Sequence, residues 1–82
     1  MTDAEPALLD ARGLYCPEPV MMLHQAIAQV QPGDRVRVLA DDPTTLRDIP
    51  QFCRHLGHEL LTSREEGDEL VFELRKGPLP PA

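Results

Sequence analysis

Hydrophobic residues follow two different periods in the first half of the chain, and each period predicts a different element. After Pro17, apolar side chains recur three or four positions apart, which predicts the buried face of a helix that ends before Pro32. The residues of this face are Val20, Leu23, Ile27 and Val30. In residues 35–40, valine alternates with arginine, and this period of two predicts a half-buried strand.

Shorter patterns predict three more strands. The apolar run of residues 7–11 precedes a turn at Gly13 and predicts the first strand. Residues 59–63 predict a third strand, which is followed by a glycine-centred turn at residues 65–68. Residues 69–75 predict a fourth strand, whose inward side chains are Leu70, Phe72 and Leu74.

A second helix is predicted in the middle of the chain. Asp41-Asp42-Pro43 marks its start, because an acidic cap before a proline is typical of a first helical turn, and Gly57 marks its end. The predicted apolar face consists of Leu46, Ile49, Cys53 and Leu56. Since a proline inside a helix removes a backbone hydrogen bond, Pro50 is expected to bend or divide this helix.

The order of the predicted elements defines the fold class. Two strand-helix-strand units with right-handed crossovers place both helices on the same face of one sheet. The prediction is therefore an α/β fold of the α+β type, a two-layer sandwich with βαβαββ order. We expect one domain at residues 7–76, between a flexible N-terminus at residues 1–6 and a flexible, proline-rich tail at residues 77–82.

Composition and charge narrow the possible functions. At 82 residues with 41% hydrophobic side chains, the chain has material for a single core. Its formal net charge of -6 argues against unaided binding to a phosphate backbone. The first ten residues do not resemble a secretory signal and no apolar run is long enough to cross a bilayer, so we expect a cytoplasmic protein without a membrane segment. The 2 cysteines, Cys16 and Cys53, are too few for a disulfide framework.

Cys16 is the candidate reactive residue, because of its position at the start of the first predicted helix. It stands at the predicted N-cap of the first helix, where unpaired N–H groups and the helix dipole favour an anion such as a thiolate. Pro17 and Pro19 remove two of these donors and leave the N–H groups of Glu18 and Val20.

Nearby charges are expected to shift the pKa of Cys16 only modestly. Arg12 is predicted to stabilise the thiolate across the turn, whereas Glu18 opposes it. Such a balance suits a thiol that must both accept and release a sulfur atom. The alternative interpretation is a buried cysteine that packs as a small hydrophobe. A loop-to-helix junction beside Tyr15 favours the exposed, reactive thiol.

Residues 10–20, with the sequence DARGLYCPEPV, resemble the TusA family of sulfur carriers, whose hallmark is a Cys-Pro-x-Pro motif at the start of the first helix. The similarity extends over about Leu9 to Gly77. It includes Met21-Met22, Gln31-Pro32-Gly33, Ala40-Asp41-Asp42-Pro43, Arg47-Asp48-Ile49-Pro50 and Phe52-Cys53. The resemblance implies a mixed four-stranded sheet, in agreement with the order of elements predicted above.

The resemblance also implies a function that spacing does not supply. Members of the family receive persulfide sulfur from an IscS-type cysteine desulfurase and relay it to a TusBCD-type complex, and through TusE to the enzyme that makes 2-thiouridine at the tRNA wobble position. Relatives supply sulfur for molybdenum cofactor maturation or for sulfur oxidation. The active cysteine of the family corresponds to Cys16, and its motif prolines correspond to Pro17 and Pro19. The supporting motif adds Arg12, Gly13 and Glu18, and the implied sulfur transfer requires no metal, nucleotide or organic cofactor.

Other residues carry weaker predictions. The side chains predicted to contact a partner are Glu18, Met21, Asp41 and Asp42. Helix capping is the alternative role for at least one of the aspartates, and packing in the core is the alternative for one of the two neighbouring methionines. Cys53 lies on the predicted apolar face of the second helix, which favours a core role over redox pairing. The three histidines lack a zinc-ligand spacing with either cysteine.

Two further function classes stay open on the sequence alone. A regulatory or redox thiol protein would oxidise Cys16 without carrying sulfur. An RNA-binding module is opposed by the acidic balance and the lack of a basic, aromatic surface, so we expect no direct tRNA binding. We further expect a monomer whose partners are a sulfur donor and a sulfur acceptor.

Overall fold

Six elements follow one another in the predicted order in the computed structural model, which describes residues 5–78. They are β1 (Ala7–Asp10), α1 (Glu18–Ala28), β2 (Arg35–Ala40), α2 (Thr45–Leu56), β3 (Glu59–Glu66) and β4 (Glu69–Arg75). β2 and β4 have the predicted bounds, whereas β3 continues three residues further than predicted. The turn after β3 is therefore only two residues long, and Gly67 adopts the positive φ of 65° that such tight hairpins require.

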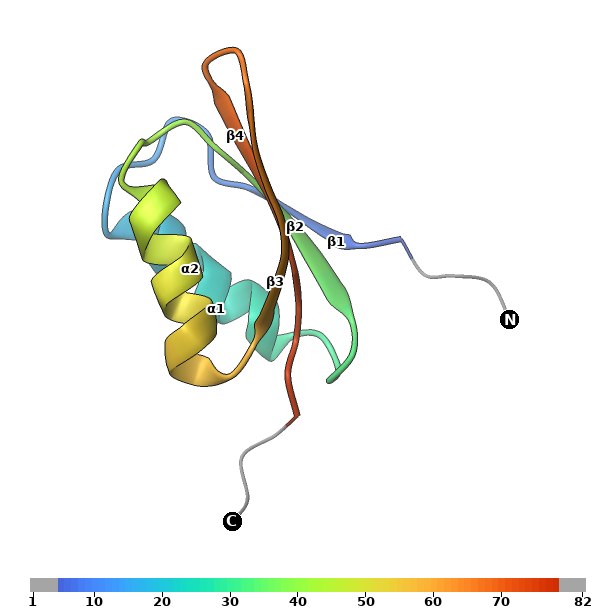
Figure 1. Cartoon of the computed structure of the whole chain (residues 1–82). Helices are drawn as coiled ribbons and strands as arrows, with labels where there is room; N and C mark the ends of the chain where they lie inside the picture. The colour runs from blue at the N-terminus through green and yellow to red at the C-terminus, as the bar shows by residue number, and fades with distance from the viewer. Residues whose placement is uncertain (1–4, 79–82) are drawn as a thin grey trace.

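The sheet is mixed and has the order β1-β2-β4-β3. β1 and β2 are parallel, while β4 pairs antiparallel with both β2 and β3. Both helices cover one face of this sheet (Figure 1). The predicted α+β two-layer sandwich with βαβαββ order is confirmed. Because β1 and β2 run in the same direction, the loops that follow them leave the sheet at the same edge.

The core lies between the helices and the sheet. Its fully buried members include Leu23 from α1, Ile49 from α2 and Phe72 from β4. All three side chains predicted to point inward from β4 are buried. At the far end of α1, Nζ of Lys76 donates hydrogen bonds of 2.8 Å to the carbonyl oxygens of Ile27, in the last turn of the helix, and of Val30, which follows the helix.

The buried face of α2 differs from the predicted one. Leu46 and Leu56 are 40% and 46% exposed. The buried side chains of the helix are Thr45, Ile49, Phe52 and Cys53. The helix is thus rotated so that it buries Phe52, which has more apolar surface than either leucine. It also runs through Pro50 as a single element, so the proline does not divide it.

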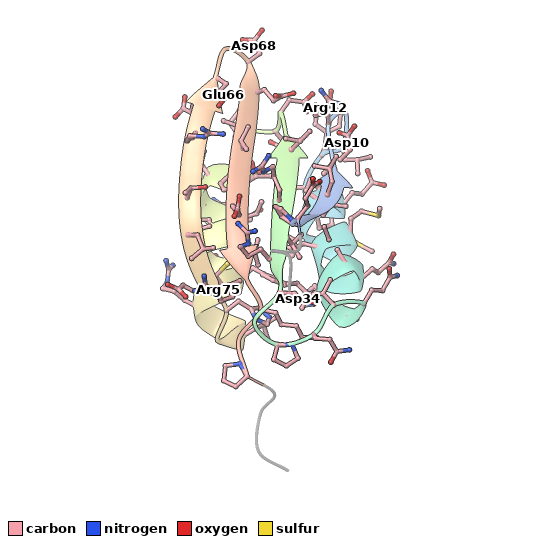
Figure 2. All side chains as sticks on the ribbon, turned by 90° about the vertical axis from the view of Figure 1, so that its right-hand side faces the viewer. Asp10, Arg12, Asp34, Glu66, Asp68 and Arg75 are labelled. Atoms are coloured by element: carbon pink, nitrogen blue, oxygen red, sulfur yellow. The ribbon has the colours of Figure 1, made fainter. Side chains whose placement is uncertain are left out.

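The opposite face of the sheet has no helix over it and carries charged side chains, among them Asp10 and Arg75 (Figure 2). Glu73 lies on this face and pairs with Arg35 at 2.9 Å and with Arg37 at 3.2 Å. The two arginines of β2 therefore point outward while its valines are buried, as the period of two predicts.

The chain ends lie mostly outside the described residues. Of the residues predicted to be flexible, 1–4 and 79–82 lie outside the described residues, whereas Gly77 is held by the hydrogen bond from its N–H to Nδ1 of His58. Within residues 5–78, no helix has the length and apolar character needed to cross a membrane.

Candidate functional site

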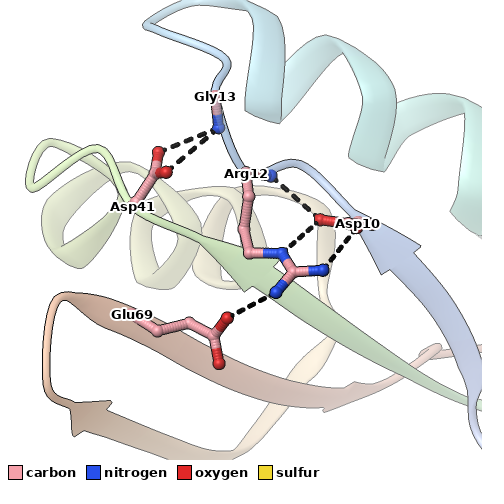
Figure 3. Close-up of polar contacts among 5 residues, drawn as sticks. All are labelled: Asp10, Arg12, Gly13, Asp41 and Glu69. Atoms are coloured by element: carbon pink, nitrogen blue, oxygen red, sulfur yellow. Dashed lines mark hydrogen bonds and ion pairs between the residues drawn. The ribbon is translucent and has the colours of Figure 1, made fainter.

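Two loops meet at the edge of the sheet where β1 and β2 end. The N–H of Ala11 donates to the carbonyl oxygen of Leu39 at 2.7 Å and continues the β1–β2 pairing into the first loop. The N–H of Gly13 donates to both carboxylate oxygens of Asp41, at 3.0 and 3.1 Å (Figure 3). The loop that precedes α1 is therefore attached to the loop that precedes α2.

Asp42 makes the second attachment between these loops. Its Oδ2 accepts a 2.8 Å hydrogen bond from the N–H of Cys16, and its Oδ1 accepts one from the N–H of Thr44 at 3.0 Å. These backbone hydrogen bonds, first that from Thr44, lower the pKa of Asp42. The residue is only 7% exposed, so the predicted partner contact at Asp42 does not fit. The N-cap of α2 is Thr44, which has no side-chain cap, so the Asp42 carboxylate joins the two loops rather than capping the helix.

The structure places Cys16 one residue before the position we predicted. The N-cap of α1 is Pro17, which has no N–H and no capping side chain, and the preceding Cys16–Pro17 peptide bond is cis. The N–H of Glu18, predicted to face the sulfur, donates instead to the carbonyl oxygen of Tyr15 at 2.8 Å. Cys16 is a free thiol and is exposed, which rules out the alternative of a buried small hydrophobe.

The charges that act on Cys16 come from α2 rather than from the predicted residues. A hydrogen bond with the Asp48 side chain is the main cause that raises the pKa of the thiol, followed by desolvation. The negative charges of Asp48 and Asp42 act in the same direction. The positive charge of Arg47 acts in the opposite direction, and its Nε lies 3.1 Å from Oδ1 of Asp48.

Arg12 does not stabilise the Cys16 thiolate as predicted. Its guanidinium binds both carboxylate oxygens of Asp10 at 2.8 Å and Oε2 of Glu69 at 2.8 Å (Figure 3). Side-chain hydrogen bonding to this arginine lowers the pKa of Asp10 to about 2. The guanidinium thus binds side chains of β1 and β4 and holds the first loop against the sheet.

A groove of about 380 Å³ opens beside Cys16 between the two helices. The α1 side contributes Val20 and His24, and the α2 side contributes Asp48 and Leu56. The full lining is Cys16, Pro17, Val20, His24, Asp48, Gln51, Phe52, His55 and Leu56. The reactive sulfur therefore stands at the border of a mostly apolar depression with one carboxylate in it.

The remaining residues predicted to contact a partner are exposed, but none of them lines this groove. Glu18 is exposed, and Met21 and Met22 are 56% and 38% exposed, so neither methionine is a core residue. Asp41 is also exposed, although its carboxylate is engaged by the N–H of Gly13. Exposure makes these contacts possible and leaves them as predictions.

Cys53 takes the predicted place in the core. It is 2% exposed and is a free thiol, so no disulfide joins it to Cys16. Burial raises its pKa to about 11, which keeps the thiol protonated and unreactive at neutral pH.

The histidines take part in packing. The ring of Phe52 contacts His24 edge-on at 4.7 Å and stacks on His58 at 5.6 Å. Nδ1 of His58 accepts the N–H of Gly77 at 2.9 Å. Within residues 5–78, no group of three or more histidine, cysteine or acidic side chains is placed to hold a metal ion.

Asp48 and Arg47 are the site residues that sequence reasoning missed. Asp48 belongs to a segment that matches the family, and Arg47 was considered only as a cation for an acidic partner, so neither was predicted to act on the thiol. Their signal was the topology: helices that follow two neighbouring parallel strands both begin at one edge of the sheet, so the first turn of α2 must face the loop that carries Cys16.

Together, the fold and the site define a small two-layer domain that presents one free, exposed thiol directly before its first helix. The family model described as "Sulfurtransferase TusA" matches residues 7–76. A sulfur carrier protein TusA from Pseudomonas putida is 53% identical over 77 residues, which cover 93% of this chain and 96% of the relative. One from Pseudomonas aeruginosa is 51% identical over 76 residues, with the same coverage.

The chain belongs to the TusA family of sulfur carriers, and it acts in sulfur transfer between a donor and an acceptor. The crystal structure of a SirA-like protein from Desulfitobacterium hafniense shares the fold, with a TM-score of 0.71 over 88% of this chain and 99% of that one. At 24% identity, this second similarity concerns the fold alone.

Proposed function

We propose that Cys16 carries the sulfur as a persulfide. The Cys16 thiolate attacks the outer sulfur of a persulfide on the donor, the donor cysteine leaves as a thiolate, and Cys16 becomes Cys–S–SH. In the second transfer, a thiolate of the acceptor attacks the outer sulfur of Cys16, and the Cys16 thiolate leaves. Neither step changes the overall redox state, so no external oxidant or reductant takes part.

The observation that carries this proposal is the position of Cys16. The thiol is exposed and free in the loop before α1, and this loop is attached to its neighbour through the Cys16 N–H and Asp42. A sulfur atom held in this way is accessible to a second protein, while its backbone has a defined place. Cys53, by contrast, is buried and cannot meet an incoming persulfide.

The proposed donor is an IscS-type cysteine desulfurase, and the proposed acceptor is a TusBCD-type complex that leads to 2-thiouridine in tRNA. Support comes from membership of the TusA family and from the names of the relatives that match over nearly their whole length. The acidic net charge of -6 supports a relay through proteins rather than direct contact with tRNA.

The test follows labelled sulfur from cysteine through a reconstituted relay. Wild type, Cys16→Ser and Cys53→Ala are each incubated with desulfurase and cysteine, and intact mass shows whether one sulfur atom is added. We expect loading of wild type and of Cys53→Ala, and none of Cys16→Ser. Loading of Cys16→Ser would remove Cys16 from the mechanism.

The same measurement separates sulfur transfer from a purely redox role. A regulatory redox thiol would gain oxygen or a disulfide partner, but no persulfide, under these conditions. Addition of the TusBCD-type complex then tests the route, because the loaded carrier should lose its extra sulfur to that complex. If the carrier kept its extra sulfur in the presence of this complex but lost it to a molybdenum cofactor or sulfur oxidation system, it would belong to another pathway.

A further inference from the structure

Loading of Cys16 requires a thiolate, and the charges around the sulfur oppose one. Thiolates rather than thiols attack a persulfide, so a cysteine that accepts sulfur usually has positive charge nearby. The carboxylate of Asp48 has the largest effect on the pKa of Cys16, which it raises. The negative charge of Asp42 raises this pKa further. These charges raise the pKa of Cys16 and so favour the protonated thiol in the free carrier.

The described residues offer little compensation for these carboxylates. Arg47 is the arginine that favours the thiolate, but its side chain is 73% exposed and its Nε is bound to Asp48. His24 from α1 and His55 from α2 line the same groove and are the other titratable groups that face it. Arg12 is bound to Asp10 and Glu69 on the sheet.

We propose that the groove beside Cys16 receives a segment of the sulfur donor that carries a basic side chain next to its own cysteine, and that this side chain pairs with Asp48. The proposal rests on the proposed function, because it names what the donor must bring to the same site. In the second transfer Cys16 is the leaving thiolate, so a cation at the same place would also favour discharge to the acceptor.

The geometry fits an incoming cation at this place. The Asp48 side chain is 17% exposed and lines the groove together with Cys16, so a partner atom in the groove reaches both. Val20, Phe52 and Leu56 give the groove an apolar wall, which would cover the aliphatic stem of a lysine or arginine. A cation paired with Asp48 removes the opposition to the thiolate at the moment when the donor persulfide arrives.

The consequence is a carrier whose thiol reacts slowly in the free protein and becomes reactive when the donor binds. Small electrophiles and oxidants react with thiolates, so a protonated Cys16 is protected from them in the free protein. The cationic donor segment would supply both the sulfur and the charge that permits its transfer.

The test uses two small disulfides of equal length, cationic cystamine and neutral bis(2-hydroxyethyl) disulfide, as probes of charge next to a sulfur. Rates of mixed-disulfide formation at Cys16 are measured by mass spectrometry, with peptide mapping, at pH 7.5. N-acetylcysteine amide, a neutral thiol, provides the reference ratio of the two rates. We expect the wild-type ratio to exceed the reference by about fivefold, since one charge pair at a partly exposed site has about that effect.

Asp48→Asn should bring the ratio close to the reference and should speed the reaction with the neutral probe. Glu59→Gln is the matched control, because it removes a carboxylate that pairs with Arg75 on the open sheet face, and it should keep the wild-type ratio. The wild-type ratio should also decrease towards the reference in 0.5 M salt, a result that needs no variant to fold.

A wild-type ratio equal to the reference would overturn the proposal, and so would an undiminished ratio in Asp48→Asn. Either result would leave the carrier function intact, because that function is tested independently by sulfur loading of Cys16→Ser.

Discussion

The N–H of Cys16 donates a 2.8 Å hydrogen bond to Oδ2 of Asp42, a residue 26 positions further along the chain. The same carboxylate accepts the N–H of Thr44 at the start of α2, so one buried side chain ties the reactive loop to the second helix. The position of the thiol therefore depends on a residue that is not part of the Cys-Pro-x-Pro motif.

Asp42→Ala should lower the stability of the domain and loosen the loop of Cys16. The substitution leaves two backbone N–H groups without their acceptor in a place with little access to water, which costs more than the loss of an exposed hydrogen bond. We expect Tm to fall by about 4–8 °C in a thermal melt followed by circular dichroism. Asp42→Asn keeps an oxygen acceptor, so its Tm should decrease less than that of Asp42→Ala. Equal decreases in Tm for both variants would mean that stability depends on the charge of Asp42 rather than on its acceptor oxygen.

Arg47 and Arg12 should differ in their effect on the thiol. Arg47→Gln removes the positive charge that favours the Cys16 thiolate, so the pKa of Cys16 should rise further and alkylation by iodoacetamide should become slower at pH 8. Arg12→Gln should leave the pH midpoint of alkylation unchanged, because that guanidinium is bound to Asp10 and Glu69. A larger shift in Arg12→Gln than in Arg47→Gln would restore the prediction made from the sequence.

The wild-type alkylation profile should itself have its midpoint above the ordinary cysteine pKa of about 8.5. The hydrogen bond with Asp48 has this sign, since it raises the pKa of Cys16. The rate is measured against pH from 6 to 11, with the reaction at Cys53 followed separately by peptide mapping. A midpoint below neutrality would contradict the charge arrangement described for the site.

Cys53 should contribute to stability in a way that disappears in alkali. Its pKa is raised to about 11 in the folded protein, above the value of about 8.5 in the unfolded chain. The folded state thus holds its proton to higher pH, and the stabilisation is complete below pH 8.5 and lost as the pH rises through 11. Over that window the free energy of unfolding should fall more in wild type than in Cys53→Ala, by up to about 3 kcal/mol. Urea unfolding under reducing conditions measures the difference, and parallel pH curves would contradict it.

The order of elements was predictable because each follows from local chemistry. The valine-arginine alternation of β2 has the period of a strand, and Gly57 ends α2 in the left-handed conformation, with φ 78°, that favours glycine. The exposure of Cys16 followed in the same way, from a cysteine placed at a loop-to-helix junction beside two prolines.

The face of α2 and the charges at the thiol were not predictable from local pattern. Leu46 and Phe52 compete for the buried side of the helix, and only the space left by α1 and the sheet decides in favour of Phe52. Arg12 is near Cys16 in the sequence, yet a bidentate contact with Asp10 directs its guanidinium to the sheet. Asp48 acts on the thiol across 32 residues, through the meeting of two loops at one sheet edge.

Gly77 should be a position at which even a methyl group is costly. A Cβ atom built there overlaps the carbonyl oxygen of Gly57, because the chain after β4 passes directly against the end of α2. The N–H of Gly77 also donates to Nδ1 of His58 at 2.9 Å, which prevents the backbone from moving away without loss of that bond. We expect Gly77→Ala to reduce the free energy of unfolding by about 1–3 kcal/mol in urea. Pro78→Ala changes an exposed neighbour and should stay within about 0.5 kcal/mol of wild type. If Gly77→Ala were equally neutral, the close approach of these two segments would not exist in solution.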